Sequence, residues 1–204
     1  ATGGIADFAA RSVSQKLSET LGVPVVVENR AGAGGITGAE IVAKAAPDGY
    51  TLLVTSISHT INPSVRKNLP FDAVRDFAPV TLITDAPNFL VVHPSLPVKT
   101  VKELVALARA RPGQITYASS GTGTSTHLSG ELFKSLARID IVHVPYKGGG
   151  PAVIDLIGGH VLMMFSTLPS VLQQVRAWKL RGLAVTGGRR FPAVQCRACA
   201  MRFL

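Results

Sequence analysis

The sequence predicts an α/β protein in which parallel-rich sheets are flanked by helices. Short apolar, β-branched runs alternate along the chain with segments whose apolar residues recur at helical spacing. Turns rich in glycine or proline separate most of these runs. Hydrophobic residues make up 47% and charged residues 16% of the 204 residues, which is the composition of a folded protein with sizeable cores. Such alternation is typical of parallel sheets covered by helices on both faces.

The first 86 residues predict two helices and three strands. Apolar residues between Ile5 and Leu21 recur at near-helical spacing, and Gly22 ends that helix. A β-branched run follows, then a glycine-rich turn and an alanine-rich helix. Asp48-Gly49 favours a tight turn, and residues 56–76 are expected to be irregular. The predicted helices cover 5–21 and 39–46, and the predicted strands cover 23–28, 50–55 and 77–83.

The rest of the chain repeats strand and helix with few interruptions. Thr100 and Glu103 have the spacing of a capping box, which marks a helix start, and Pro112-Gly113 closes that helix. Strands are predicted over 88–93, 115–119, 141–144, 161–165 and 180–186, and helices over 100–110, 125–136, 151–157 and 169–176.

Charge and composition exclude several classes of function. The formal net charge is +9, but no run of Lys and Arg interleaved with aromatic residues is present, so we expect no nucleic-acid partner. Apolar stretches such as 161–165 are far too short to cross a bilayer. A basic protein of this kind is better suited to attracting small anions.

Two Gly/Ser/Thr-rich turns that open predicted helices are the strongest functional signals. One spans 1–7 and contains Gly3, Gly4 and Asp7; the other spans 119–124, directly after a predicted strand. The start of a helix carries unpaired main-chain N–H groups and a partial positive charge, so it favours anions. Each turn could also be an ordinary capped helix start.

Other motifs give weaker signals. Residues 119–126 lack the Walker pattern of a phosphate-binding loop. The glycine-rich segment 32–38 lacks the third glycine of a dinucleotide fingerprint, and no acidic residue follows at the expected distance. The five histidines show no metal-ligand spacing, no Gly-x-Ser-x-Gly elbow is present, and Cys196-x-x-Cys199 stands alone. We therefore expect no catalytic residues, no metal and no cofactor.

Six segments, in order, carry a resemblance to a known family. They begin at Gly3-Gly4, 25–35 (Val-Val-Val-Glu-Asn-Arg-x-Gly-Ala-Gly-Gly) and Pro47-Asp48-Gly49-Tyr50, and continue at 119–128, 144–148 (Val-Pro-Tyr-Lys-Gly) and 183–186. Together they resemble the solute receptors of tripartite tricarboxylate transporters, the Bug-type periplasmic binding proteins. Each segment alone is weak, but six in family order over residues 3–190 are specific.

The resemblance implies a type II, two-lobed binding protein with Venus-flytrap closure. A first lobe is expected over 1–86 plus 187–204 and a second over 87–186. Such receptors are not enzymes; they are periplasmic, capture a small carboxylate and deliver it to membrane transporter subunits. Carried over to this sequence, the ligand-binding residues are Gly3, Gly4, Asp7, Thr55 and Ser56 in the first lobe, and Ser119, Ser120, Gly121, Thr124, His127, Phe165 and Ser166 in the second.

The sequence departs from the family at both ends. The strand that precedes the first turn in family members is not present, and 191–204 resembles nothing in the family. We therefore expect a truncated or frame-disrupted product whose first lobe is incomplete, less stable and weaker in binding than longer relatives.

Alternatives to carboxylate capture remain open. The glycine-rich turns could serve a nucleotide- or phosphate-handling α/β enzyme, or the chain could be a degenerate remnant without activity. Asp7 could pair with an ammonium group, which would favour an amino acid over a tricarboxylate. The solute classes left open are a di- or tricarboxylate, an amino acid and an aromatic acid.

Overall fold

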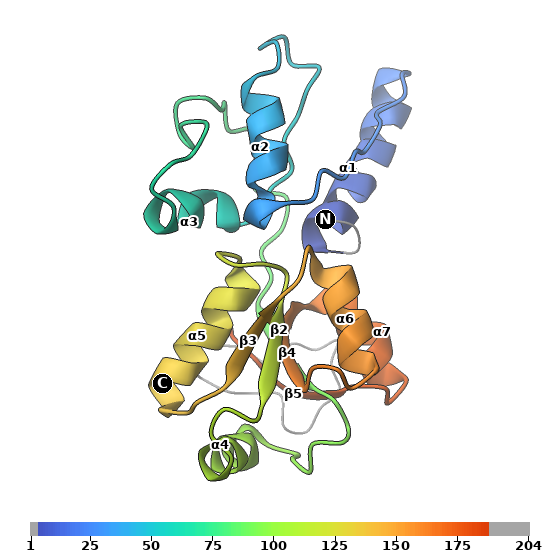
Figure 1. The fold of residues 1–204 in the computed structure, drawn as a ribbon. Helices are drawn as coiled ribbons and strands as arrows, with labels where there is room; N and C mark the ends of the chain where they lie inside the picture. Colours follow the sequence, from blue (N-terminus) through green and yellow to red (C-terminus); the bar gives the residue numbers. More distant parts are fainter. Residues whose placement is uncertain (1–3, 188–204) are drawn as a thin grey trace.

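The computed structural model describes residues 4–187, which form two lobes joined by the segment between α3 and β1 (Figure 1). Gly3, the two cysteines and the segment 188–204 lie outside the described residues. The first lobe contains α1 (Ile5–Leu21), the short 3₁₀ turn η1 (Ala33–Gly35), α2 (Ile36–Ala43) and α3 (Ser58–Val65). In the part of the chain that the structure describes, we find no helix that has both the length and the apolar character needed to span a bilayer.

The second lobe is built on a five-stranded sheet with the order β3-β2-β4-β1-β5. β2 pairs in parallel with β3 and β4, whereas β1 is antiparallel to both β4 and β5. Four strands therefore run in one direction and β1 runs against them, which confirms a parallel-rich sheet. The strands are β1 (Asn88–Val92), β2 (Thr116–Ser119), β3 (Val142–Pro145), β4 (Met163–Thr167) and β5 (Arg181–Val185).

Helices cover both faces of this sheet. Leu90 and Val92 of β1 belong to one apolar cluster with residues of α4 (Val101–Ala110) and α5 (Ser125–Ala137). The alternate residues Phe89 and Val91 belong to a second cluster with α6 (Gly149–Ile157) and α7 (Leu168–Arg176). Successive strand residues point to opposite faces, so both faces of β1 are buried.

The expected strands of the first lobe are not formed. Residues 23–28, 50–55 and 77–83 have no strand partner among the described residues. A strand needs a neighbour for its main-chain groups, and a β-branched run does not supply one. Side chains expected to be half-buried are exposed instead, with Val26 at 79%, Val80 at 83% and Leu82 at 81%.

A helix replaces part of the segment expected to be irregular. α3 contains Pro63, which removes one main-chain donor from the helix. The next turn nevertheless forms, because the amide of Arg66 donates to the Asn62 carbonyl at 3.0 Å. Proline therefore weakened the sequence signal without preventing this eight-residue helix.

The start of β1 and the residue that follows β5 are hydrogen-bonded to each other. The amide of Thr186 donates to the Asn88 carbonyl at 2.8 Å. The amide of Asn88 in turn donates to the Thr186 hydroxyl at 2.9 Å. This reciprocal pair fixes the start of β1 to the residue that follows β5.

Candidate functional site

Several helices of both lobes begin at the boundary between the lobes. Figure 1 shows that α1 and α2 start at their ends nearest the second lobe, while α5 and α6 start at their ends nearest the first. Each start presents unpaired main-chain N–H groups and a partial positive charge. The lobe boundary is therefore favourable to an anion.

The turn between β2 and α5 is held by its own hydroxyl groups. Thr124 caps α5: its hydroxyl accepts from the His127 amide at 3.4 Å and donates to the Gly121 carbonyl at 2.6 Å. Gly121 has φ +130°, and a Cβ there would lie 3.2 Å from the Tyr146 carbonyl oxygen. Any other residue would be strained here by this φ, and the turn lies close to the residue that follows β3.

Most amides of this turn already have acceptors within it. The Ser120 amide donates to Thr126 Oγ1 at 3.0 Å and the Gly121 amide to Ser119 Oγ at 3.2 Å. The Gly123 amide donates to His127 Nδ1 at 3.3 Å. Among the described residues, neither the amide of Thr122 nor the hydroxyl of Ser120 has a hydrogen-bond partner. These two groups are the free donors of the turn.

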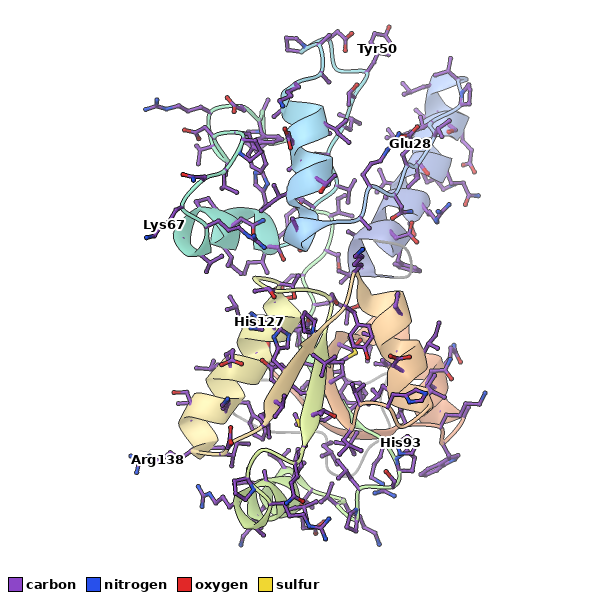
Figure 2. All side chains as sticks on the ribbon, in the orientation of Figure 1. Glu28, Tyr50, Lys67, His93, His127 and Arg138 are labelled. Atoms are coloured by element: carbon purple, nitrogen blue, oxygen red, sulfur yellow. The ribbon has the colours of Figure 1, made fainter. Side chains whose placement is uncertain are left out.

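A histidine pair supports the turn from below. Ser119 Oγ lies 2.6 Å from His143 Nε2, and the His127 and His143 rings lie 4.2 Å apart. Burial and, secondarily, the neighbouring His127 lower the pKa of His143 to about 4, so this imidazole is neutral at pH 7. Figure 2 places His127 at the lobe boundary, near the start of α5.

Tyr117 extends this support to α5. Its ring stacks on His143 at 4.8 Å, and its hydroxyl donates to Glu131 at 2.5 Å. Burial, followed by the hydrogen bond to Glu131 and that residue's charge, raises the pKa of Tyr117. The phenol therefore remains a donor at neutral pH.

The Ser119–His143 contact resembles the pair of an activated nucleophile and its base. Ser119, however, is completely buried beneath the turn, with 0% of its surface exposed. Its hydroxyl has a structural use instead, because it joins His143 to the Gly121 amide. This arrangement supports a binding site better than a reaction site.

The first turn begins with Gly4, the N-cap of α1, whose backbone is extended. Asp7 lies in the first turn of the helix and is buried. Its carboxylate accepts from Arg11 Nε at 3.0 Å and from Asn29 Nδ2 at 2.7 Å. Asp7 therefore connects the start of α1 to the segment that precedes η1.

The remaining predicted residues lie in two different environments. Thr55 is exposed and Ser56 half-buried just before α3, where Ser56 Oγ lies 3.2 Å from Ser58 Oγ. Phe165 is fully buried in the sheet core against Phe133, with ring centroids 5.8 Å apart, and Ser166 is 1% exposed. The structure does not bring Phe165 to the lobe boundary.

A third glycine turn at the boundary was not among the predicted site residues. Gly148 precedes α6, and a Cβ on Gly149 would lie 3.7 Å from Ser120 Oγ and 3.8 Å from Ser170 Oγ. Thr167 Oγ1 and Ser170 Oγ are 2.9 Å apart beside it. Three consecutive glycines after a strand were the available sequence signal.

These features define a two-lobed α/β protein with glycine-rich turns where its lobes meet. The family described as "Tripartite tricarboxylate transporter family receptor" matches residues 9–200. The chain belongs to this family, which confirms the resemblance drawn from the six sequence segments.

Individual relatives agree with this assignment. The chain is 41% identical over 201 residues to protein BugT of Bordetella pertussis, covering 96% of this chain and 62% of that protein. It matches the structure of R. palustris Rpa4515 with adipate at a TM-score of 0.94 and 38% identity, over 98% of this chain and 67% of the other. It matches the structure of MatC from Rhodopseudomonas palustris with bound malate at a TM-score of 0.88 and 32% identity. This match covers 94% of this chain and 66% of the other. The chain thus spans about three fifths of the curated relative's length.

Proposed function

We propose that this chain captures a small organic carboxylate between its lobes and serves a tripartite tricarboxylate-type transporter in the periplasm. The observation that carries the proposal is that α1, α2, α5 and α6 all start at the lobe boundary. Membership of the receptor family and the adipate and malate in the two similar structures support the same chemistry.

The binding residues follow from the groups left free at this boundary. In the second lobe the Ser120 hydroxyl donates to one carboxylate, while the α6 start and Ser170 lie beside it. In the first lobe the main chain at Gly4, where α1 begins, meets the other end of the solute. Ser119, Gly121, Thr124 and His127 shape the second turn from within.

Asp7 serves this site by holding the first turn in place. Arg11 Nε and Asn29 Nδ2 both donate to its Oδ1, which ties the carboxylate to neighbouring residues of the first lobe. Replacing Asp7 by Asn is then expected to weaken malate and aspartate binding equally. A selective loss for aspartate would favour direct pairing with an ammonium group.

Calorimetric titration with malate and adipate tests the proposal, with acetate as a monocarboxylate control. We expect both diacids to bind more tightly than acetate, and Ser120→Ala to weaken diacid binding by about tenfold, the effect of one hydrogen bond to a charged group. Absence of heat with both diacids, or equal binding of acetate, would contradict the proposal. Turnover of a phosphate ester abolished by Ser119→Ala would instead favour the enzyme alternative.

A further inference from the structure

Asn62 is a buried side chain with one half of its hydrogen-bonding capacity unused. It lies on α3 and is only 2% exposed. Its Nδ2 donates to the Gly34 carbonyl at 3.4 Å, whereas its Oδ1 has no partner among the described residues. A buried acceptor without a donor is unfavourable, so a group that reaches it is stabilising.

The orientation of this carboxamide follows from its neighbours. Rotating it by 180° would place Oδ1 against the Gly34 carbonyl, and two acceptors would then face each other. The nitrogen therefore faces the Gly34 carbonyl, and the oxygen takes the other position of the carboxamide, 3.7 Å from where a Cβ on Gly34 would lie.

Asn62 Oδ1 lies beside the second lobe. A Cβ on Gly123 would be 3.5 Å from this oxygen, and a Cβ on Gly34 would be 3.0 Å from the Thr122 carbonyl oxygen. Gly34 and Gly123 have φ of +70° and +83°. The main chains of the two lobes thus meet at a pair of glycines, with the Asn62 oxygen between them.

The facing turn contains main-chain donors that could reach this oxygen. The Thr122 amide has no partner in the described part of the chain, and the Gly123 amide makes only a long bond of 3.3 Å to His127. The oxygen itself is sealed from solvent. A main-chain N–H of the turn can therefore approach it more readily than a solute bound between the lobes.

We propose that Asn62 is a positioning residue that latches the lobes together. On closure its Oδ1 accepts a main-chain N–H from Thr122 or Gly123, so the first lobe orients the turn that carries Ser120. The inference rests on the proposed function, because it explains how capture of a solute is coupled to closure.

Asn62→Leu tests the latch, since leucine has a similar volume and no acceptor. Asn68→Leu is the matched control, because Asn68 is exposed on the same lobe. With malate as the probe, surface plasmon resonance should show a dissociation rate about fivefold to tenfold faster for Asn62→Leu, the effect of one hydrogen bond. The association rate and the Asn68→Leu protein should remain within about twofold of the original.

Amide hydrogen exchange by NMR, with and without malate, separates a latch from a general packing role. Asn62→Leu should speed exchange at Thr122 and Gly123 and leave the β2 and β4 amides unchanged. Loss of protection throughout the sheet, or exchange at 122 and 123 equal to that of Asn68→Leu, would overturn the inference. If the original chain binds no malate, the proposed function fails, and the ligand-free exchange comparison still decides the latch.

Discussion

His143 is the residue whose protonation matters most for the site. It contacts Ser119, His127 and Tyr117, all of which belong to the turn or its support. Burial lowers the pKa of this imidazole to about 4, so the native state holds it in the neutral form at higher pH.

Stability should therefore decrease as the solution becomes acidic. An unfolded histidine has a pKa of about 6.5, so between pH 6.5 and pH 4 the unfolded chain binds a proton that the folded chain does not. The stabilising contribution is complete above pH 6.5 and is lost as the pH falls towards 4. The melting temperature should depend less on pH across this range in His143→Gln than in the original protein. The exposed control His160→Gln should keep the original pH dependence. Parallel slopes in all three proteins would exclude His143 as the cause.

Gly130 is required by the ring of Tyr117. A Cβ at this position in α5 would lie 2.3 Å from Tyr117 Cε2. Gly130→Ala should therefore destabilise the protein by about 1–3 kcal/mol, despite the better helix propensity of alanine. Gly38→Ala in α2 is the control, because its Cβ would meet the Arg30 carbonyl at an ordinary 3.5 Å. Urea unfolding that ranks the two variants equally would refute this packing argument.

At the scale of elements, local sequence patterns were enough to predict the strands of the second lobe. The strands predicted in the first lobe depend on pairing partners distant in sequence, which local patterns do not reveal. Residues 161–165 were predicted as a strand, and β4 spans Met163–Thr167. The three predicted strands of the first lobe failed because strand formation depends on a partner that the run itself does not encode. α3 was missed because Asn62-Pro63 was interpreted as irregular.

The same distinction applies to the candidate site. Both glycine-rich turns were visible because their residues are adjacent in sequence. His143 was not, since it meets Ser119 across 24 positions. Asn62 contacts Gly34 across 28 positions, and nothing local distinguishes it from an ordinary turn asparagine.

Variants of two helix caps should show whether a loss of stability alone is enough to weaken binding. Thr100→Ala and Thr124→Ala each remove a hydroxyl that accepts from the N3 amide, so each should cost about 1 kcal/mol in urea unfolding. Only Thr124→Ala should also weaken malate binding, because the Thr124 hydroxyl additionally holds the Gly121 carbonyl. Thr124→Ser, which keeps that hydroxyl, should restore most of the affinity. Equal effects of the two alanine variants on binding would contradict a specific role for the α5 cap.

At the scale of the whole molecule, the lobes differ in how well their cores are closed. The second lobe buries both faces of its sheet, whereas the described part of the first lobe has a small apolar cluster around Ile36, Ala39 and Phe71. Large apolar side chains of the first lobe are exposed, including Tyr50 at 92%. Figure 2 shows Tyr50 at the tip of this lobe, away from the lobe boundary.

Unfolding should consequently occur in two steps. Hydrogen exchange should be fast over 23–28, 50–55 and 77–83, whose main chains are not paired in a sheet, and slow in β1, β2 and β4. A dye that binds exposed apolar surface should fluoresce with the native chain and respond to the first step. A single cooperative transition with uniform protection would show that the two lobes stabilise each other more than their packing indicates.

The central claim is that one carboxylate solute is held between the starts of α1 and α5. An NMR titration of the ¹⁵N-labelled chain with malate tests it most directly, because it detects weak binding at individual amides. We expect the amides of residues 4–6 and 120–123 to shift together and to saturate with one dissociation constant. Shifts confined to one turn, two separate saturation curves or a response centred elsewhere in the chain would contradict the claim.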